Sequence, residues 1–398
     1  MQGKMGKGFD RVDWELNSKI MKINYLRLRE ISKHQEPLNF FYDESNNIRR
    51  FKNNNGSFNN DKYCNFSLSG LVLHKNVKAM DFEKLVDQLG FQNNANFSEF
   101  KLKHFLVKKE KDFIKRINSK KLCDLLEYLN SKQGIYIHFS ILNFFYYGIV
   151  DIVDTLFEVG EYYDKGESDN LKSFVYEKMI LEYENWAEKF LKYQFPNIPK
   201  EKMSSFLNDL IAYFARLRTY GKKEKRQSDK FIQLCSKRKR KLESKPHILL
   251  SRNESNSLVN SLSEVYQQRV IVYDKAYHMF DEEDTIIEEW KKNGFYTWGD
   301  KRRFEFCKSE TDIRIQISDV LSGLIAKLFD FLAGIHSIKD LECMIQSISK
   351  DSNSYKVLKN LFLLLDKSEA YDSFFWNFSA PKIDIEKFRF LCNHMLDY

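Results

Sequence analysis

Proline and glycine are scarce in this chain of 398 residues, which has 5 prolines and 15 glycines. Because both residues interrupt helices, their scarcity indicates a helix-rich fold. Hydrophobic residues make up 43% of the chain, a share that excludes a disordered protein. No apolar run reaches the length of a membrane span, since the best candidate, 135–150, is interrupted by His, Ser, Asn and Gly. We therefore expect no contact with a membrane.

Cysteine is also sparse, and its spacing excludes a common kind of site. The six cysteines stand singly, with no C-x-x-C pair and no Cys/His cluster, so a structural zinc site is not expected. Reduced, mostly buried thiols are the simpler interpretation. The first residues carry Gly and Lys without the apolar segment of a signal peptide. Together these features predict a cytoplasmic protein.

The charge is mildly basic, and one segment concentrates it. The formal net charge is +8, which fits an anionic partner without requiring one. The run 222–241 predicts contacts with nucleic-acid phosphates, although a solvated helix face or a linker explains such a run equally well. The predicted nucleic-acid-binding residues are Lys222, Lys223, Lys225, Arg226, Lys237, Arg238, Lys239 and Arg240.

Hydrophobic patterning predicts an α/β fold. Strands are expected at 38–43, 48–52, 63–74, 135–142, 270–273 and 303–307, and the first three read as a β-meander. Helices are expected at 14–31, 77–89, 108–129, 144–159, 173–193, 202–217, 281–290 and 313–332, followed by two or three more near the end. Residues 146–260 contain no strand candidate and read as a helical block.

Four carboxylates stand out by their positions. Asp43 ends the first strand, Glu99 precedes a long helix, Asp274 follows the run Val270–Tyr273, and Asp319 lies in an apolar helix. An acid so close to a core is costly unless it is paired or used. Carboxylates converging from strand ends and one helix can bind two divalent cations about 4 Å apart, for which Mg²⁺ or Mn²⁺ is the natural choice.

The helix that carries Asp319 has further polar features. Gln316 lies one turn before Asp319 and Gly323 one turn after it, so all three share a face. Glycine inside a helix costs about 1 kcal/mol relative to alanine. We therefore expect Gly323 to allow the close approach of another element, namely the sheet edge that carries Asp43.

At these residues the sequence resembles domain-of-unknown-function family 3800, whose members have an RNase H-like fold. The matching segments are Asp43-Glu44-Ser45, Glu99-Phe100-Lys101, Val270–Asp274, and Ser309 with the helix motif from Gln316 through Asp319 to Gly323. The match departs from the family where Asn46 replaces a glycine, Ser318 replaces an alanine, Lys275 stands where an acid is common, and Asn143 replaces an Asp-Lys pair. Asn tolerates the left-handed conformation, so the turn at Asn46 is expected to survive.

The resemblance implies a domain order. It predicts an N-terminal extension at 1–35 and an RNase H-like core at 36–145 and 263–332, with a mixed sheet. It also predicts a large helical insertion at 146–262 and a helical C-terminal tail at 333–398.

The resemblance also implies a metal-dependent nuclease that cleaves phosphodiester bonds of RNA or DNA, in settings such as bacterial antiphage defence or toxin action. The implied catalytic metal ligands are Asp43, Glu99, Asp274 and Asp319, with Mg²⁺ or Mn²⁺ as cofactor. Supporting roles are predicted for Glu44, Lys101, Asn143, Ser309 and Gln316. Glu44 is given a supporting role because neighbouring residues of a strand point to opposite faces.

Two alternatives stay open at this point. The acids could be remnants in an inactive RNase H-like protein that binds nucleic acid, or the chain could be a scaffold in a larger complex, as a homo-oligomer or with an accessory protein. His138 is expected to pack in the core, whereas His278, close after Asp274, is a candidate general acid.

Overall fold

The computed structural model describes residues 38–78, 82, 85, 89–90, 101–157, 165–245, 247–251, 253–297 and 304–397. The predicted N-terminal extension, its helix at 14–31, and Glu99 lie outside these residues, as does most of the predicted helix 77–89. In the part of the chain that is described, no single helix is long and apolar enough to cross a membrane.

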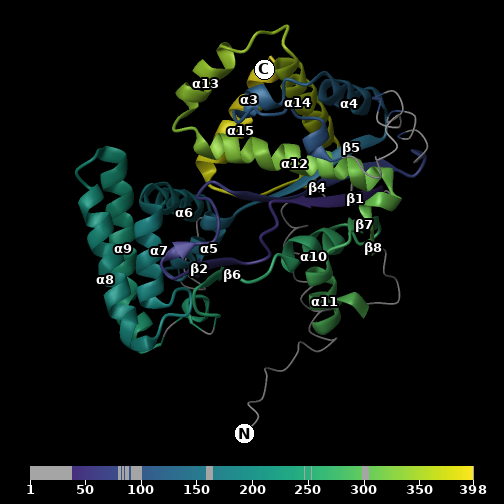
Figure 1. Ribbon diagram of the computed structural model, residues 1–398. Coiled ribbons are helices and arrows are strands. Elements are labelled where there is room, and N and C mark those ends of the chain that lie inside the picture. Colours follow the sequence, from purple (N-terminus) through teal and green to yellow (C-terminus); the bar gives the residue numbers. More distant parts are fainter. Residues whose placement is uncertain are drawn as a thin grey trace.

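A mixed sheet of six strands forms the centre of the protein (Figure 1), which confirms the α/β class. Its spatial order is β8-β7-β1-β4-β5-β9. The strands are β1 (Leu38–Ser45), β4 (Asn65–His74), β5 (Ile135–Asn143), β7 (Tyr277–Asp281), β8 (Phe304–Cys307) and β9 (Trp376–Ser379). β4 is antiparallel to both β1 and β5, whereas β7 is parallel to β1, β8 to β7, and β9 to β5. β1 is thus flanked by one antiparallel and one parallel neighbour.

The predicted three-strand meander is wrong in one respect. The segment after β1 leaves the main sheet and forms a small second sheet of β2 (Phe51–Asn54), β3 (Ser57–Phe58) and β6 (Ser257–Val259). Asn46 and Arg49 adopt left-handed backbone conformations, with φ of 58° and 59°, and these turn the chain away. The expectation that Asn46 would keep a left-handed turn is confirmed.

Two predicted segments have a different secondary structure. Val270–Val272 belongs to helix α10 (Ser263–Val272) rather than to a strand. All three of these side chains are buried, and a short buried helix presents the same apolar run as a buried strand. The predicted helix 108–129 is broken into α3 (Phe113–Arg116) and α4 (Lys120–Ser131), where Ser119 caps α4 by accepting the N–H of Leu122.

Helices cover both faces of the main sheet. In Figure 1, α12 (Ile313–Gly334), α14 (Asn353–Tyr371) and α15 (Lys382–Met395) lie on one side, with α10 and α11 (Asp284–Lys292) on the other. α12 packs across β1 and β4, and α14 packs against β5 and α4. The predicted helix 313–332 is therefore confirmed, and it is the main cover of the central strand.

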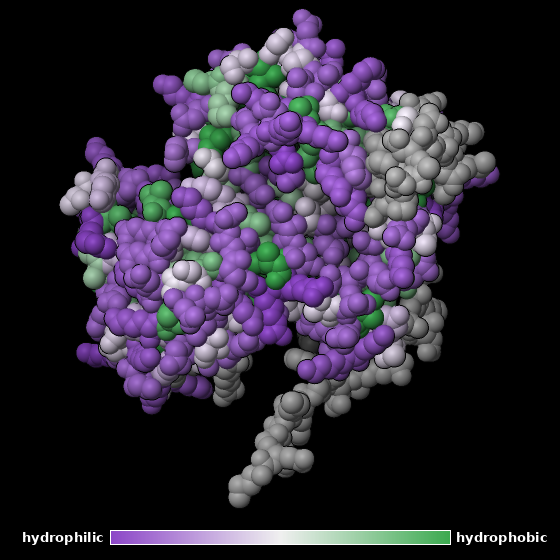
Figure 2. Space-filling view, viewed as in Figure 1, coloured by the Kyte–Doolittle hydropathy of each residue, from purple (hydrophilic) through white to green (hydrophobic). Residues whose placement is uncertain are grey.

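The helical block is confirmed as mostly helical. Its helices are α5 (Phe144–Asp154), α6 (Lys165–Met179), α7 (Tyr183–Tyr193), α8 (Lys200–Leu217) and α9 (Lys222–Ser244). The expectation that 146–260 holds no strand is wrong, because β6 pairs with β2 and ties the end of this block to the turn after β1. The face shown in Figure 2 is largely hydrophilic over this block, with small, separate apolar spots.

The C-terminal tail is more than a set of helices. Besides α13 (Ile338–Gln346), α14 and α15 it contains β9, which extends the main sheet beside β5. Phe388 of α15 and Phe329 of α12 stack with ring centroids 5.1 Å apart. The tail therefore shares the hydrophobic core of the sheet.

Candidate functional site

The ends of β1 and β7 bring two carboxylates side by side. These parallel strands pair through Tyr42 and Phe280, whose rings stack with centroids 4.3 Å apart. Asp43 and Asp281 are the next residues of the two strands, so they project to the opposite face of the sheet. Neighbouring strands lie about 4.8 Å apart, which places the two acids within reach of one ion. Asp43 is buried, with 6% of its surface exposed.

Helix α12 supplies the third carboxylate from above this face. Ser318 donates a hydrogen bond to the carbonyl of Phe41 at 3.3 Å and accepts one from the N–H of Leu71 at 3.2 Å. Gly70 lies directly below, where a Cβ atom would collide with the Phe41 carbonyl and with Ser318. The helix therefore approaches the sheet more closely than a larger residue would permit, and Asp319 follows at the next position.

The close approach expected at Gly323 has a different partner. A Cβ at Gly323 would lie 2.7 Å from Cδ2 of Leu102, so this glycine admits the 3₁₀ turn η2 (Leu102–His104) rather than the edge of the sheet. The N–H of Leu102 donates to Oδ1 of Asp319 at 2.8 Å. Gly323 thus allows η2 to come close enough to hold the carboxylate of Asp319.

The three acids lie within electrostatic range of one another. Burial raises the pKa of Asp43 well above its ordinary value, and the charges of Glu44, Asp319 and Asp281 raise it further. The N–H of Glu44, which donates to Asp43 Oδ1 at 2.6 Å, acts in the opposite direction. Asp43 forms no ion pair with any residue that the structure describes. Three carboxylates therefore act on one another at this point of the fold.

Glu44 lies on the other face of β1. Burial raises its pKa to about 7, with further contributions from the charges of Glu283 and Asp281. Asn47 donates to Glu44 at 3.4 Å and to Glu283 at 3.4 Å, and Arg49 pairs with Glu283 at 3.5 Å. Glu44 is thus next to the acid cluster but lies on the opposite face of β1 from Asp43, and its supporting role stays a prediction.

Asp281 is held by the loop that precedes α12. The N–H of Ser309 donates to Asp281 Oδ1 at 3.0 Å. Gln316, which is buried, donates its side-chain N–H to the carbonyl of Ser309 at 3.0 Å. Ser309 and Gln316 therefore lie at the predicted site, and they position Asp281.

Asp274 was the wrong choice for the late-strand acid. Its side chain is exposed beyond the end of α10, and the strand begins only at Tyr277. Asp281, which ends β7, occupies the predicted position instead. The sequence carries a signal for it, because the acidic run Asp281–Asp284 follows the apolar Met279-Phe280 directly. That run was assigned to the following helix, which begins at Asp284.

Two other predicted residues lie apart from the three acids. Asn143 ends β5, two strands away from β1, and its side-chain oxygen caps α5 by accepting the N–H of Tyr146 at 2.9 Å. That oxygen is committed to a helix terminus, so Asn143 has a structural role here. Lys101 directly precedes Leu102 and is half-buried at the start of η2, next to the residue that holds Asp319.

The predicted basic run forms helix α9. Lys222, Lys223, Lys225, Arg226, Lys237 and Arg240 are exposed on it. Lys239 is partly covered and donates to Asn208 at 2.7 Å. Arg238 differs, because it is buried and donates from Nε to the carbonyl of Leu156 at 3.0 Å. Arg238 is therefore removed from the predicted set of exposed cations.

Both histidines that were considered belong to the core. His138 is fully buried and contacts the carbonyl of Phe41 at 3.2 Å, as expected. His278 lies between the hydroxyl of Tyr42 at 2.8 Å and the carbonyl of Tyr273 at 2.9 Å. Burial lowers the pKa of His278 to about 4. It is thus neutral at physiological pH and sealed from solvent, so the general-acid role is wrong.

The three carboxylates are suited to a divalent cation, but in the described part of the chain they do not form a complete set of metal ligands. Hard oxygen donors of like charge that lie close together, here buried Asp43 with the partly exposed Asp281 and Asp319, are stabilised by a doubly charged ion. Among the described residues, however, no group of three or more His, Cys, Asp or Glu side chains is close enough to hold a metal ion. Glu99, a predicted ligand, lies outside the described residues.

Comparison with known proteins gives no functional assignment, so any assignment depends on the arrangement of Asp43, Asp281 and Asp319. No family model, no curated protein and no solved structure matches the chain.

Proposed function

We propose that this protein is an RNase H-like nuclease that hydrolyses phosphodiester bonds with the help of Mg²⁺ or Mn²⁺. The order β5-β4-β1-β7-β8 supports the fold part of the proposal. It has three antiparallel strands followed by two parallel ones, the arrangement expected of an RNase H-like sheet. The resemblance to domain-of-unknown-function family 3800 supports it as well, because Asp281-Glu282 ends the late strand as that family's Asp-Glu does.

The observation that carries the proposal is the convergence of Asp43, Asp281 and Asp319. They come from β1, β7 and α12, and each of the other two raises the pKa of Asp43. These three residues would hold the cation, together with Glu99 if that residue closes the site. A bound divalent cation would supply an activated water and stabilise the charge that develops on the phosphate.

The surrounding protein groups fix the acids in place. The Leu102 N–H holds one oxygen of Asp319, and the Ser309 N–H holds one oxygen of Asp281. Lys101, next to Leu102, is suited to a substrate phosphate.

Nucleic acid is the proposed substrate. The exposed cations of α9 support this choice, because Lys and Arg side chains bind phosphates without regard to sequence. RNA and DNA share that chemistry.

A second candidate is an inactive RNase H-like protein that binds nucleic acid or serves as a scaffold. The observation in its favour is that the described acids do not by themselves surround a metal ion. The two candidates differ in one property, which is metal-dependent cleavage.

The test is cleavage of labelled single- and double-stranded RNA and DNA in the presence of Mg²⁺ or Mn²⁺. We expect Asp43→Asn and Asp319→Asn to lower the rate by more than about 100-fold while circular dichroism stays unchanged. Asp284→Asn, which alters an exposed acid at the start of α11, serves as the control and should keep full activity. Wild-type protein that cleaves no substrate with either metal would refute the nuclease and favour the second candidate.

A further inference from the structure

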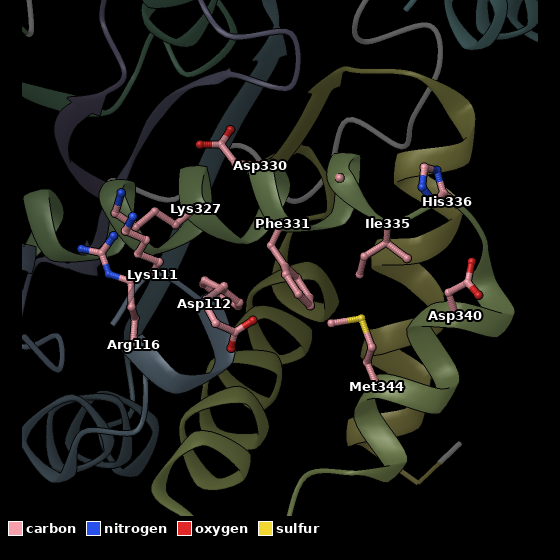
Figure 3. Close-up of a pocket in the computed structure, with 12 residues that line it drawn as sticks. Lys111, Asp112, Arg116, Lys327, Asp330, Phe331, Ile335, His336, Asp340 and Met344 are labelled. Atoms are coloured by element: carbon pink, nitrogen blue, oxygen red, sulfur yellow. The ribbon is translucent and has the colours of Figure 1, made fainter. Parts of the chain in front are cut away.

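A second charged site lies at the other end of α12. A pocket of about 610 Å³ opens between α3, the last turns of α12 and α13. This volume is in the range of sites that enclose a small organic molecule. Figure 3 shows Lys111, Arg116 and Lys327 gathered at one end of the pocket.

The three cations form no close ion pair within the described chain, although the charge of Lys327 acts to lower the pKa of Asp330. None of them forms an ion pair or a side-chain hydrogen bond with a residue that the structure describes, and Nε of Arg116 is buried without a partner. A buried guanidinium nitrogen without an acceptor is costly, so this end of the pocket favours an anion.

The pocket also contains three acids, but each is already engaged. Asp112 accepts the N–H of Lys115 at 3.0 Å, and Asp340 accepts the hydroxyl of Ser337 at 2.7 Å. Asp330 accepts the N–H and the side-chain amide of Asn65, at 2.8 and 3.0 Å. In Figure 3 the carboxylate of Asp330 points away from the middle of the pocket. These hydrogen bonds fix the acids, and within the described chain none of the three forms an ion pair with Lys111, Arg116 or Lys327.

The middle of the pocket is apolar. Phe331, Ile335 and Met344 lie there in Figure 3. The ring of Phe331 stacks on that of Phe113 with centroids 5.0 Å apart, which fixes its plane. Met344 is 36% exposed, and its flexible thioether adapts to a flat ligand. Beyond this wall lie His336 and Asp340, which can bond to polar groups on the ligand edge.

We propose that this pocket binds a nucleoside phosphate. The phosphate would lie among Lys111, Arg116 and Lys327, with the base against Phe331, Ile335 and Met344. Three cations suit a multiply charged anion, and a stacked aromatic wall suits a planar ring. Its volume of about 610 Å³ fits a single nucleotide rather than a longer strand. The site is separate from the acid cluster, since Lys327 lies eight residues after Asp319, roughly 12 Å along the helix.

The test is isothermal titration calorimetry of the full chain. The ligands are ribonucleoside 5′-monophosphates and triphosphates, with inorganic phosphate as the reference. Excess EDTA keeps divalent cations away from the acid cluster, so the result does not depend on nuclease activity. We expect at least one nucleotide to bind at least tenfold more tightly than inorganic phosphate. Nucleotides that all bind no better than phosphate would overturn the proposal.

Variants locate the site. Arg116→Gln and Lys327→Gln should each weaken nucleotide binding at least tenfold, and Phe331→Leu should weaken nucleotide but not phosphate binding. Lys115→Gln changes an exposed cation of the same helix α3 that lies outside the pocket lining, and it should bind as wild type does. Equal affinity in wild type, Arg116→Gln and Lys327→Gln, each with an unchanged melting temperature, would contradict the proposal.

Discussion

Asp319 and Lys327, in the two halves of helix α12, bring charges of opposite sign to two different sites. The first half brings Asp319 to Asp43 and Asp281, acids delivered by two strand ends of a buried sheet. The second half brings Lys327 to Lys111 and Arg116, around an open pocket between α3, α12 and α13. The first site gathers three carboxylates, which favours a cation, whereas the pocket gathers its three cations at one end, which favours an anion there. Asp43 and Asp281 lie at the ends of strands and Asp319 lies on α12, whereas Lys111 and Arg116 lie just before and at the end of the four-residue helix α3.

The largest expected effect is on the rate of cleavage, and it distinguishes the proposed metal ligands from nearby acids. Asp281→Asn should lower metal-dependent cleavage more than about 100-fold, because it removes a proposed ligand. Asp274→Asn should leave the rate within about twofold, because Asp274 is exposed beyond α10. Initial rates on one labelled substrate at saturating Mg²⁺ measure both. If Asp274→Asn lost cleavage activity while Asp281→Asn kept it, Asp274 would be the metal ligand, as predicted from the sequence.

The next effect tests the close contact that places Asp319. Gly70→Ala should destabilise the protein by about 3 kcal/mol, since its Cβ would collide with the Phe41 carbonyl and Ser318. Gly334→Ala is the control, because Gly334 ends α12 and has open space around it. This variant should change stability by no more than about 1 kcal/mol. Urea unfolding followed by circular dichroism measures both. Equal stability of the two variants would show that α12 does not need this approach.

A third effect concerns Asp330, which lies in the second half of α12. Asn46 and Asn65 both donate to it, which ties the turn after β1 to the second half of α12. Burial raises the pKa of Asp330 to about 6, above the unfolded value of about 3.9. Its contribution to stability is therefore present below about pH 4 and lost as pH rises through 6.

Asp330→Asn removes this titration. The stability of the variant relative to wild type should rise between pH 4 and pH 7, by at most about 3 kcal/mol. Urea unfolding of both proteins at a series of pH values measures the difference. A difference that is constant across this range would mean that Asp330 does not titrate as described.

The smallest effect is on the proposed nucleic-acid contacts. The double variant Lys222→Gln, Lys225→Gln should weaken binding uniformly across sequences and reduce the slope of log affinity against log salt by about 2. Stability should be unchanged, because both side chains are exposed. Fluorescence anisotropy at several salt concentrations measures the slope. A slope equal to that of wild type would remove α9 from the binding surface.

Much of the fold was predictable because its patterns are local. The strands near 38–43, 63–74 and 135–142, the helix 313–332 and the helical block all follow from periodicity. The departure of β2 into a second sheet was not predictable, since it depends on two left-handed residues and on pairing with β6, about 200 residues away. The strand β9 was missed in the tail, where its partner β5 is equally distant in sequence.

The site was predicted in part. Asp43 and Asp319 are neighbours as expected, and Ser309 and Gln316 lie beside them. The choice of Asp274 failed because the buried helix α10 has the same apolar run as a strand, and β-branched residues favoured the wrong reading. The pocket at the end of α12 could not be predicted, since its cations come from segments more than 200 residues apart.

The most direct test of the account is Mn²⁺ binding followed by electron paramagnetic resonance, which needs no substrate. Wild type and Asp274→Asn should bind Mn²⁺ with the same affinity, whereas Asp43→Asn and Asp281→Asn should bind at least tenfold more weakly. Mn²⁺ binding by Asp43→Asn and Asp281→Asn that equals that of wild type would contradict a cation site built from Asp43, Asp281 and Asp319.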